Sequence, residues 1–325
     1  MASPRIIMKL KVVATRKEPG DVFVVELKHP RKPLLPAFEP GSHVDVHLSD
    51  GRVRQYSLCG DPADRSRYTI AVKREPEGRG GSAWFHDAVC VGAELPVSAP
   101  RNHFPLKQGN GPVLLLAGGI GITPLLAMAG VLNRQGKPFE LHYFTRSRAV
   151  APLLMVIEQL IDRNNLRLHF DDEAETRQDV EALLSTRPSD AQVYYCGPPG
   201  FMAAIARATE HWPEGSAHFE AFQPAILDDA PQEPFTIILR NGTEIPVPAN
   251  TSALSAIRAA GVLLMASCEN GVCGTCECGF REGQPIHRDV VLSRDARSHR
   301  FIPCVSRATG ALRLDLQNLA LAERW

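Results

Sequence analysis

The sequence has no excess of charge of either sign. Its 325 residues include 36 lysines and arginines and 36 aspartates and glutamates. The composition therefore does not indicate the broad basic surface that nucleic acid or anionic lipid would favour as a partner. The first residues also lack an apolar stretch followed by a small-residue cleavage site, so we expect no signal peptide.

The eight cysteines lack the spacing of a disulfide framework. Four of them fall between Cys268 and Cys278, whereas Cys59, Cys90 and Cys196 are scattered. Disulfide-stapled domains are short and cysteine-dense along their whole length. The pattern instead favours a reducing compartment, the cytoplasm.

One stretch without charged residues, 109–133, is long enough to cross a bilayer. Its centre contains Gly118, Gly119, Gly121 and Pro124, where a lipid-exposed helix would lose backbone hydrogen bonds. We therefore expect a buried strand, a tight turn and a buried helix here, and no membrane span.

The chain is too long for one ordinary domain, and its hydrophobic pattern changes along its length. Residues 1–108 show the period-two alternation of short strands, which predicts a small antiparallel β-barrel. Residues 109–222 alternate strands with helices, which predicts a parallel sheet covered by helices. Residues 223–234 are rich in proline and acid and predict a linker. Residues 235–325 open with a hairpin signal at Asn-Gly and then a helix.

The strongest motif lies in this last segment. Cys268, Cys273 and Cys276 are spaced C-x4-C-x2-C, and Cys304 follows 28 residues later. This is the spacing of plant-type 2Fe-2S proteins. Each of the two irons needs two thiolates, and the glycines in the same loop would let backbone N–H groups approach the sulfurs. We therefore predict a 2Fe-2S cluster on these four cysteines.

Two other metal centres fit the sequence less well. A four-cysteine zinc site usually shows two C-x2-C pairs, and only one is present. A Rieske centre needs two histidine ligands, and neither His287 nor His299 has the required cysteine neighbour. Cys278 alternates with its neighbours as a buried strand residue would, so we do not count it as a ligand.

A one-electron cluster cannot accept a hydride, so a chain that couples it to a nicotinamide needs a flavin as a bridge. Two segments of the barrel region, RQYSL and GRGGS, are candidates for the flavin site. In the first, Arg54 would pair with a phosphate, and Tyr56 and Ser57 would line the ring system. Three residues of the second segment would offer N–H groups and a hydroxyl to the same phosphate: Gly80, Gly81 and Ser82.

Two glycine-rich turns are candidates for the nicotinamide nucleotide. The first, Gly118-Gly119-Ile120-Gly121, follows a predicted strand and opens a helix, which is the context of a phosphate-binding turn, although Pro124 replaces the usual third glycine. The second, Cys196-Gly197-Pro198, follows another strand of the same sheet. Two such turns at neighbouring strand ends predict a ligand crevice. Arg146 and Arg148 follow a third strand and would contact the adenosine ribose or be solvated.

The order of RQYSL, GRGGS, GGIGITP, CGPPGFM and CENGVCGTC resembles the phthalate dioxygenase reductase family, which belongs to the ferredoxin reductase superfamily and includes vanillate demethylase reductases. The resemblance covers nearly the whole chain. It implies an FMN barrel, a pyridine-nucleotide α/β domain and an α+β ferredoxin-like (β-grasp) domain. It also implies a monomeric reductase that takes hydride from NADH and passes single electrons to a separate Rieske oxygenase or O-demethylase acting on an aromatic substrate.

The resemblance also implies roles for single residues. Lys73 joins the FMN site, Thr123 and Phe222 border the flavin ring, and Cys196 lies beside the nicotinamide. Ser147 stands where some relatives have an acid, which leaves NADPH open as a donor. FAD in place of FMN, another electron acceptor, and a redox sensor without turnover are the alternatives. We assign no role to the tail, residues 317–325.

Overall fold

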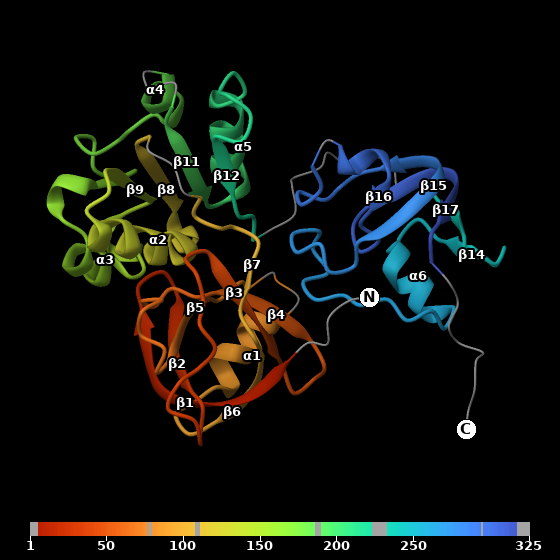
Figure 1. The fold of residues 1–325 in the computed structure, drawn as a ribbon, viewed down its shortest axis with the longest axis horizontal. Coiled ribbons are helices and arrows are strands. Elements are labelled where there is room, and N and C mark those ends of the chain that lie inside the picture. Colours follow the sequence, from red (N-terminus) through yellow and green to blue (C-terminus); the bar gives the residue numbers. More distant parts are fainter. Residues whose placement is uncertain are drawn as a thin grey trace. The chain divides into compact units, whose positions relative to one another are not determined.

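The computed structural model describes residues 6–76, 78, 80–107, 111–185, 190–222, 233–293 and 295–316. The chain forms two compact units, Met1–Phe222 and Gln223–Trp325 (Figure 1). The predicted linker falls mostly on 223–232 and the tail on 317–325, and both lie outside the described residues.

The first sheet of unit 1 is an antiparallel barrel, drawn in red and orange in Figure 1. Its strand order is β4-β3-β6-β1-β2-β5, and β7 pairs with β3. A bridge from Leu58, just after β4, to Ile70 of β5 joins the two ends of this order. The elements are β1 Ile7–Glu18, β2 Val22–Lys28, β3 Ser42–His47, β4 Val53–Ser57, β5 Tyr68–Lys73, α1 Gly81–Ala88, β6 Glu94–Ser98 and β7 Arg101–Asn102.

The second sheet of unit 1 is parallel throughout, in the order β10-β9-β8-β11-β12. Its strands are β8 Val113–Gly118, β9 Phe139–Thr145, β10 Leu166–Phe170, β11 Gln192–Cys196 and β12 Ala217–Phe219. Its helices are α2 Ile122–Gln135, α3 Leu154–Leu160, α4 Val180–Ser185 and α5 Pro199–Ala208. Separate apolar clusters join α2 and α3 to one face and α4 and α5 to the other, as expected for a buried parallel sheet.

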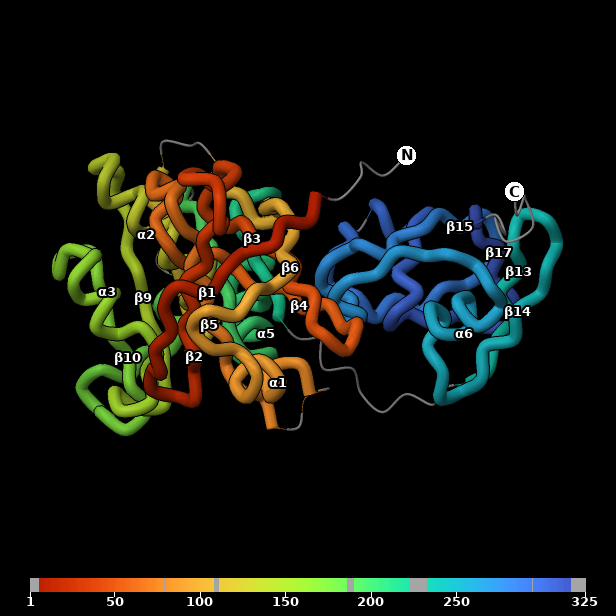
Figure 2. The backbone as a smooth tube through the Cα atoms, turned by 90° about the horizontal axis from the view of Figure 1, so that it is seen from below, coloured from red at the N-terminus to blue at the C-terminus, as the bar shows by residue number. Residues whose placement is uncertain are grey.

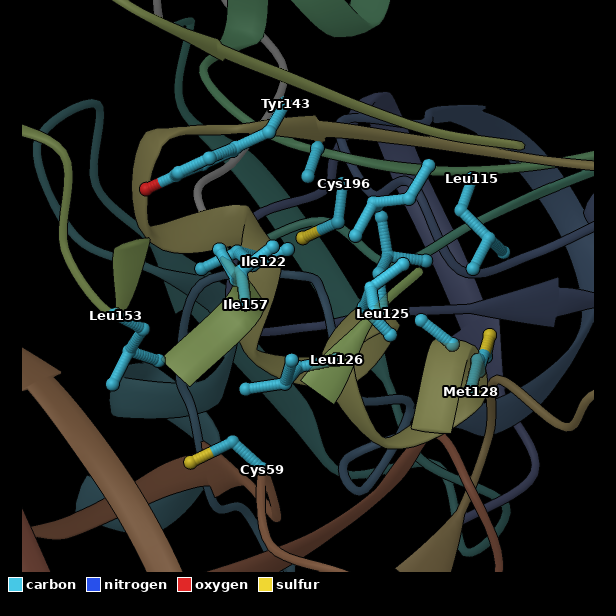
Figure 3. Packing of buried hydrophobic residues seen from close by; sticks show 14 of the residues in the cluster. Cys59, Leu115, Ile122, Leu125, Leu126, Met128, Tyr143, Leu153, Ile157 and Cys196 are labelled. Atoms are coloured by element: carbon cyan, nitrogen blue, oxygen red, sulfur yellow. The ribbon is translucent and has the colours of Figure 1, made fainter. Parts of the chain in front are cut away.

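The barrel and the parallel sheet share part of their core. Figure 3 shows Cys59, which follows β4, beside Leu126 of α2, and both belong to one cluster of buried side chains. Burying one continuous apolar surface couples the two sheets, since that surface would be exposed to water if they separated. The flavin candidates and the nicotinamide candidates thus lie on one packed body.

The described residues of unit 2 form a mixed sheet, in the order β14-β13-β17-β15-β16, with one α-helix. The predicted hairpin is present as antiparallel β13 and β14, while β17 runs parallel to β13. The helix begins after Ser252, whose Oγ accepts a hydrogen bond of 3.1 Å from N of Ser255. The elements are β13 Phe235–Ile238, β14 Glu244–Val247, α6 Ala253–Ala259, β15 Cys278–Ile286, β16 Arg300–Phe301 and β17 Arg307–Leu314.

The predicted fold class is confirmed, with one antiparallel barrel, one parallel α/β sheet and one α+β unit. Figure 2 traces the backbone through these elements, from red at the N-terminus to blue at the C-terminus. The uncharged stretch forms β8 and α2, and no helix among the described residues is long and apolar enough to span a membrane. One strand is shorter than its sequence suggests. β12 pairs only over Ala217–Phe219, so Glu220 and Phe222 lie beyond the sheet.

Candidate functional site

Two arginines meet a helix N-terminus on the barrel. Helix α1 begins after Gly80, whose φ of 72° is left-handed, a conformation that glycine adopts without strain. A Cβ on Gly81 would collide with Nε of Arg54, and a Cβ on Gly80 would lie 2.7 Å from Nη1 of Arg52. All of α1 is described, and its first turn has no acidic residue. Two guanidinium groups at the positive end of a helix form the charge pattern that binds a phosphate.

Arg52 was not among the residues predicted from the sequence. Its Nε donates to Oδ2 of Asp50 at 2.8 Å, which orients the guanidinium. The signal was available, since Arg52 stands two positions before Arg54 and alternate residues of an extended segment face the same side. Asp50 thus accepts from both Nε and Nη2 of Arg52, while Nη1 of the same guanidinium lies beside Gly80.

The other predicted flavin residues surround this helix. Oγ of Ser82 accepts from N of Glu75 at 3.0 Å, which leaves its hydroxyl proton available to donate. Lys73 ends β5, is exposed, and pairs through Nζ with Oε1 of Glu75 at 2.9 Å. The Tyr56 ring packs against Phe85 of α1, with centroids 5.3 Å apart. Burial raises the pKa of the Tyr56 phenol, so it stays protonated and donates.

A buried polar contact links the barrel to the parallel sheet. Oγ of Ser57, at the end of β4, donates to Oε2 of Glu220 at 2.8 Å. Burial raises the pKa of Glu220 to about 7, although the Ser57 hydrogen bond acts in the opposite direction. Cys196 is fully buried at the end of β11, and burial together with the Glu220 charge raises the pKa of its thiol. Cys196 is therefore a neutral thiol beside a carboxyl group that titrates near neutrality.

Glu220 is the second residue that sequence reasoning missed. It stands between Phe219 and Phe222 in a segment predicted to be a buried strand, and an acid in such a segment is itself a signal. Its backbone N donates to O of Tyr195 at 3.2 Å, so the chain remains beside β11 after β12 ends. The end of the predicted strand therefore brings this carboxyl group to Ser57.

Thr123 and Phe222 both belong to the parallel-sheet part of unit 1. Thr123 is buried in the first turn of α2, where its Oγ1 donates to O of Ile120 at 3.0 Å. Phe222 packs against the apolar cluster that contains Cys196. Phe222 thus contacts the core that the barrel and the parallel sheet share, and the roles of both residues beside the flavin ring stay predictions.

The two glycine-rich turns touch each other. Strands β8 and β11 are neighbours, so their carboxyl ends lie side by side. A Cβ on Gly121 would collide with O of Cys196, and a Cβ on Gly118 would lie 2.8 Å from Cδ of Pro198 and 3.2 Å from Cα of Gly197. Gly119 has a φ of 54° and open space where a side chain would point. Gly118 and Gly121 are needed because the two turns approach each other closely, and Gly119 because its φ is left-handed.

The two arginines after β9 are in different environments. The Arg148 guanidinium lies 4.7 Å from the centroid of Phe170 and pairs with Oε1 of Glu158 at 3.2 Å. Arg146 is exposed, and its carbonyl accepts from N of Asp172 at 3.2 Å. Arg148 is therefore partly neutralised by an acid, and Arg146 has an acidic residue next to it.

In unit 2 the four predicted ligands form two pairs. The thiols of Cys268 and Cys273 hydrogen-bond to each other, as do those of Cys276 and Cys304. Within each pair the hydrogen bond lowers the pKa of one thiol, Cys273 or Cys276, and raises that of its partner. Across the described residues, no group of three or more histidine, cysteine or acidic side chains is placed to hold a single ion. Two pairs of thiols match two irons with two thiolates each.

Backbone donors also reach these sulfurs. N of Asn270 donates to Sγ of Cys268 at 3.3 Å, and N of Thr275 to Sγ of Cys273 at 3.5 Å. Gly271 has a φ of 73°, and a Cβ there would lie 2.5 Å from Cγ2 of Val305, so the loop needs glycine at this point. The loop therefore supplies both the thiols and the N–H groups that stabilise a more negative sulfur.

Cys278 lies apart from these pairs. It begins β15, is buried, and its Sγ donates to O of Phe301 at 3.7 Å. Burial raises the pKa of its thiol. Cys278 is thus a buried strand residue, as its alternation predicted.

Comparison with known proteins extends these observations to the whole chain. Residues 237–309 match the family described as the 2Fe-2S iron-sulfur cluster binding domain. Phthalate dioxygenase reductase of Burkholderia cepacia is 39% identical over 313 residues, which cover 95% of this chain and 97% of that protein. The chain belongs to the phthalate dioxygenase reductase family.

Two further comparisons agree with this family. The reductase subunit of the tert-butanol monooxygenase / tert-amyl alcohol desaturase of Aquincola tertiaricarbonis is 44% identical, covering 87% of this chain and 88% of that one. A solved phthalate dioxygenase reductase, described as a modular structure for electron transfer from pyridine nucleotides to [2Fe-2S], matches with a TM-score of 0.75 and 38% identity over 95% of this chain and 98% of that one. This member of the phthalate dioxygenase reductase family is therefore an oxidoreductase with the family's three-part fold.

Proposed function

We propose that this protein oxidises NADH, passes the electrons through FMN to its own 2Fe-2S cluster, and delivers them singly to a Rieske-type oxygenase or O-demethylase. The observation that carries the proposal is the arrangement of four cysteines as two hydrogen-bonded pairs within a matched 2Fe-2S domain. The same chain carries the barrel and parallel-sheet unit with its phosphate-type helix terminus. An electron-transfer chain needs both parts.

The residues around α1 fit FMN, whose phosphate is terminal. Arg54 and Arg52 would hold the phosphate together with the N–H groups of Gly81 and Ser82. Tyr56 and Ser57 would line the ring system, with Lys73 at the edge of the site. Bound here, the flavin would supply a group that takes up electrons in pairs and releases them singly. FAD is the alternative that the experiment below distinguishes.

The touching turns fit the nicotinamide nucleotide. Gly118, Gly119 and Gly121 would offer backbone N–H groups to its pyrophosphate, with Gly197 and Pro198 on the other side and Arg146 at the ribose. Thr123, Cys196 and Phe222 would shape the space where the two ring systems meet. NADH is the expected donor because Arg148 already pairs with Glu158, which leaves a 2′-phosphate with one cation fewer.

The charge balance of the reaction gives Glu220 a role. Oxidation of NADH to NAD⁺ releases two electrons and one proton, and an iron-sulfur cluster on thiolates takes only the electrons. The proton has to leave the site, and a buried residue that titrates near neutrality is suited to carry it. Glu220 has a pKa of about 7 and accepts a hydrogen bond from Ser57, so these two side chains would carry the proton away.

The partner is an oxygenase component, and we place the reductase in the cytoplasm. All eight cysteines are free thiols, which suits a reducing compartment. An aromatic substrate for the partner is expected from the phthalate name, while the tert-butanol name shows that a relative serves a different substrate.

We propose a monomer divided into an FMN barrel at 1–108, an NAD domain at 109–222, a linker at 223–234 and a ferredoxin domain at 235–325. Size-exclusion chromatography tests the monomer.

One set of measurements tests the function. The visible spectrum of the purified protein should show flavin and 2Fe-2S bands together, and acid treatment should release FMN. NADH should reduce cytochrome c in a reaction that needs the cluster. Release of FAD would correct the flavin, and the absence of flavin bands or of NADH oxidation would refute the proposal.

A further inference from the structure

One histidine of the barrel, His43, is buried on β3 between β4 and β7. His43 of β3 pairs in register with Ser57 of β4 on one side and with Arg101 of β7 on the other. Asp45 follows His43 by two positions on β3 and pairs in register with Gln55 of β4. The sheet therefore brings five polar side chains to one face, although most of this barrel is filled with apolar residues.

The neighbours of His43 decide which of its nitrogens carries the proton. Nε2 of Gln55 lies 3.0 Å from Oδ1 of Asp45 and 3.3 Å from Nε2 of His43. A carboxylate only accepts hydrogen bonds, so the Gln55 atom at Asp45 must be the amide NH₂ group. The same NH₂ group then donates its second hydrogen to Nε2 of His43. That nitrogen is the acceptor, and the proton of a neutral His43 is on Nδ1.

This series of polar contacts begins with an ion pair between Arg101 and Asp45. Nη2 of Arg101 lies 2.6 Å from Oδ2 of Asp45, which is completely buried. The guanidinium of Arg101 and the amide of Gln55 thus reach different oxygens of the same carboxyl group. Asp45 thus accepts from both Arg101 and Gln55, and the Gln55 amide donates to both Asp45 and His43.

The protonated nitrogen of His43 faces Glu220. Nδ1 lies 3.9 Å from Oε1 of Glu220, whose other oxygen accepts from Ser57. Among the residues that the structure describes, Nδ1 has no hydrogen-bond partner. A shift of less than 1 Å would complete a bond of ordinary length between them.

We propose that His43 is a positioning residue that directs its Nδ1–H at Glu220 and stabilises the ionised form of that carboxyl group. The proposal rests on the proposed function, because it concerns the residue that takes the proton released from NADH. Burial lowers the pKa of His43 to about 3, with Arg101 and His103 acting in the same direction and Asp45 opposing them. His43 therefore stays neutral and remains a donor while Glu220 gains or loses its proton.

The proton balance is simple. Ionised Glu220 accepts one proton for each NADH oxidised and later releases it to water, and His43 keeps its own proton throughout. The charged and polar groups that face this exchange are Ser57, Cys196, His43, Arg101, His103, Asp45 and Gln55. Removing the Nδ1–H donor should make Glu220 hold its proton more tightly.

The test compares four variants of the full-length, flavin-loaded protein: His43→Leu, His43→Asn, Gln55→Leu and His47→Leu. The asparagine amide can place an N–H near the position of Nδ1. His47 ends the same strand, β3, and pairs in register with Val53 instead of Ser57, so it serves as the control. The infrared carboxyl band that Glu220→Gln abolishes reports the protonation of Glu220 without turnover. The pH profile of kcat/KM for NADH with ferricyanide reports it during turnover.

We expect the Glu220 midpoint to rise by about one pH unit in His43→Leu, the size expected from losing one hydrogen bond to a charged group. His43→Asn and His47→Leu should keep the wild-type midpoint, and Gln55→Leu should raise it because Nδ1–H is no longer enforced. If His43→Leu loses its flavin, Gln55→Leu decides. An unchanged midpoint in a folded His43→Leu or Gln55→Leu protein overturns the proposal. Failure of the proposed function would appear differently, as no NADH oxidation by the wild type at any pH.

Discussion

The Arg54→Ala variant tests the flavin site most directly. Nε of Arg54 lies against Gly81, so its guanidinium is beside the N–H groups at the start of α1. A hydrogen bond between charged partners contributes about 1.5–3 kcal/mol. Loss of that contribution corresponds to a flavin Kd that is roughly 10-fold to 150-fold weaker, at about 1.4 kcal/mol for each factor of ten.

Substitutions of two other arginines provide comparisons for the expected loss of flavin affinity in Arg54→Ala. Arg52 is already bound to Asp50 and one third exposed, so Arg52→Ala should weaken flavin binding by roughly threefold to tenfold. Arg146 lies at the end of β9 in the parallel sheet, so Arg146→Ala should change flavin affinity by less than about twofold. The expected order of the effects is therefore Arg54, Arg52, Arg146.

The assay is the flavin content per chain after dialysis, followed by titration of the flavin-free protein with FMN while its fluorescence is quenched. Circular dichroism of each variant checks that the barrel remains folded. Equal flavin retention in Arg54→Ala and Arg146→Ala would refute the assignment of the phosphate to the start of α1. A loss of flavin from Arg52→Ala alone would show that Arg52, and not Arg54, binds the phosphate.

Three further predictions concern the rest of the electron path. Cys278→Ser should keep the cluster and Cys273→Ser should lose it, because only Cys273 belongs to a thiol pair. Iron and acid-labile sulfide contents test this, and a Cys278→Ser protein without iron would show that the ligand set is wrong. The kcat/KM for NADH should exceed that for NADPH by at least about tenfold, since Arg148 is paired with Glu158; equal values would contradict this. A chain ending at Gln223 should fold, bind flavin and reduce ferricyanide with NADH but reduce cytochrome c slowly, because residues 1–222 form a compact unit with its own core. If stopped-flow absorbance shows that this truncated protein binds flavin but NADH does not reduce it, hydride transfer needs unit 2.

Much of the fold could be predicted from the sequence because its signals are local. Period-two alternation indicated the barrel strands, strand and helix alternation indicated the parallel sheet, and Asn241-Gly242 marked the hairpin of unit 2. The cluster motif was equally local, since three of its four cysteines lie within nine residues. The roles predicted for the flavin and nicotinamide residues stay predictions, although the structure brings several of them together.

The tertiary structure decided what depends on distant residues. Ser57 and Glu220 are 163 positions apart, and no spacing rule connects them before the barrel packs on the parallel sheet. Arg52 gained its place only when α1 folded back onto the start of β4. The proton position on His43 follows from three strands held in one register, which fixes Asp45, Gln55 and Arg101 around it. The sequence by itself therefore determined the elements and the cluster ligands, which local patterns encode. Only the folded chain could determine the pKa of Glu220 and the partners of Ser57, because burial and contact between distant segments arise from packing.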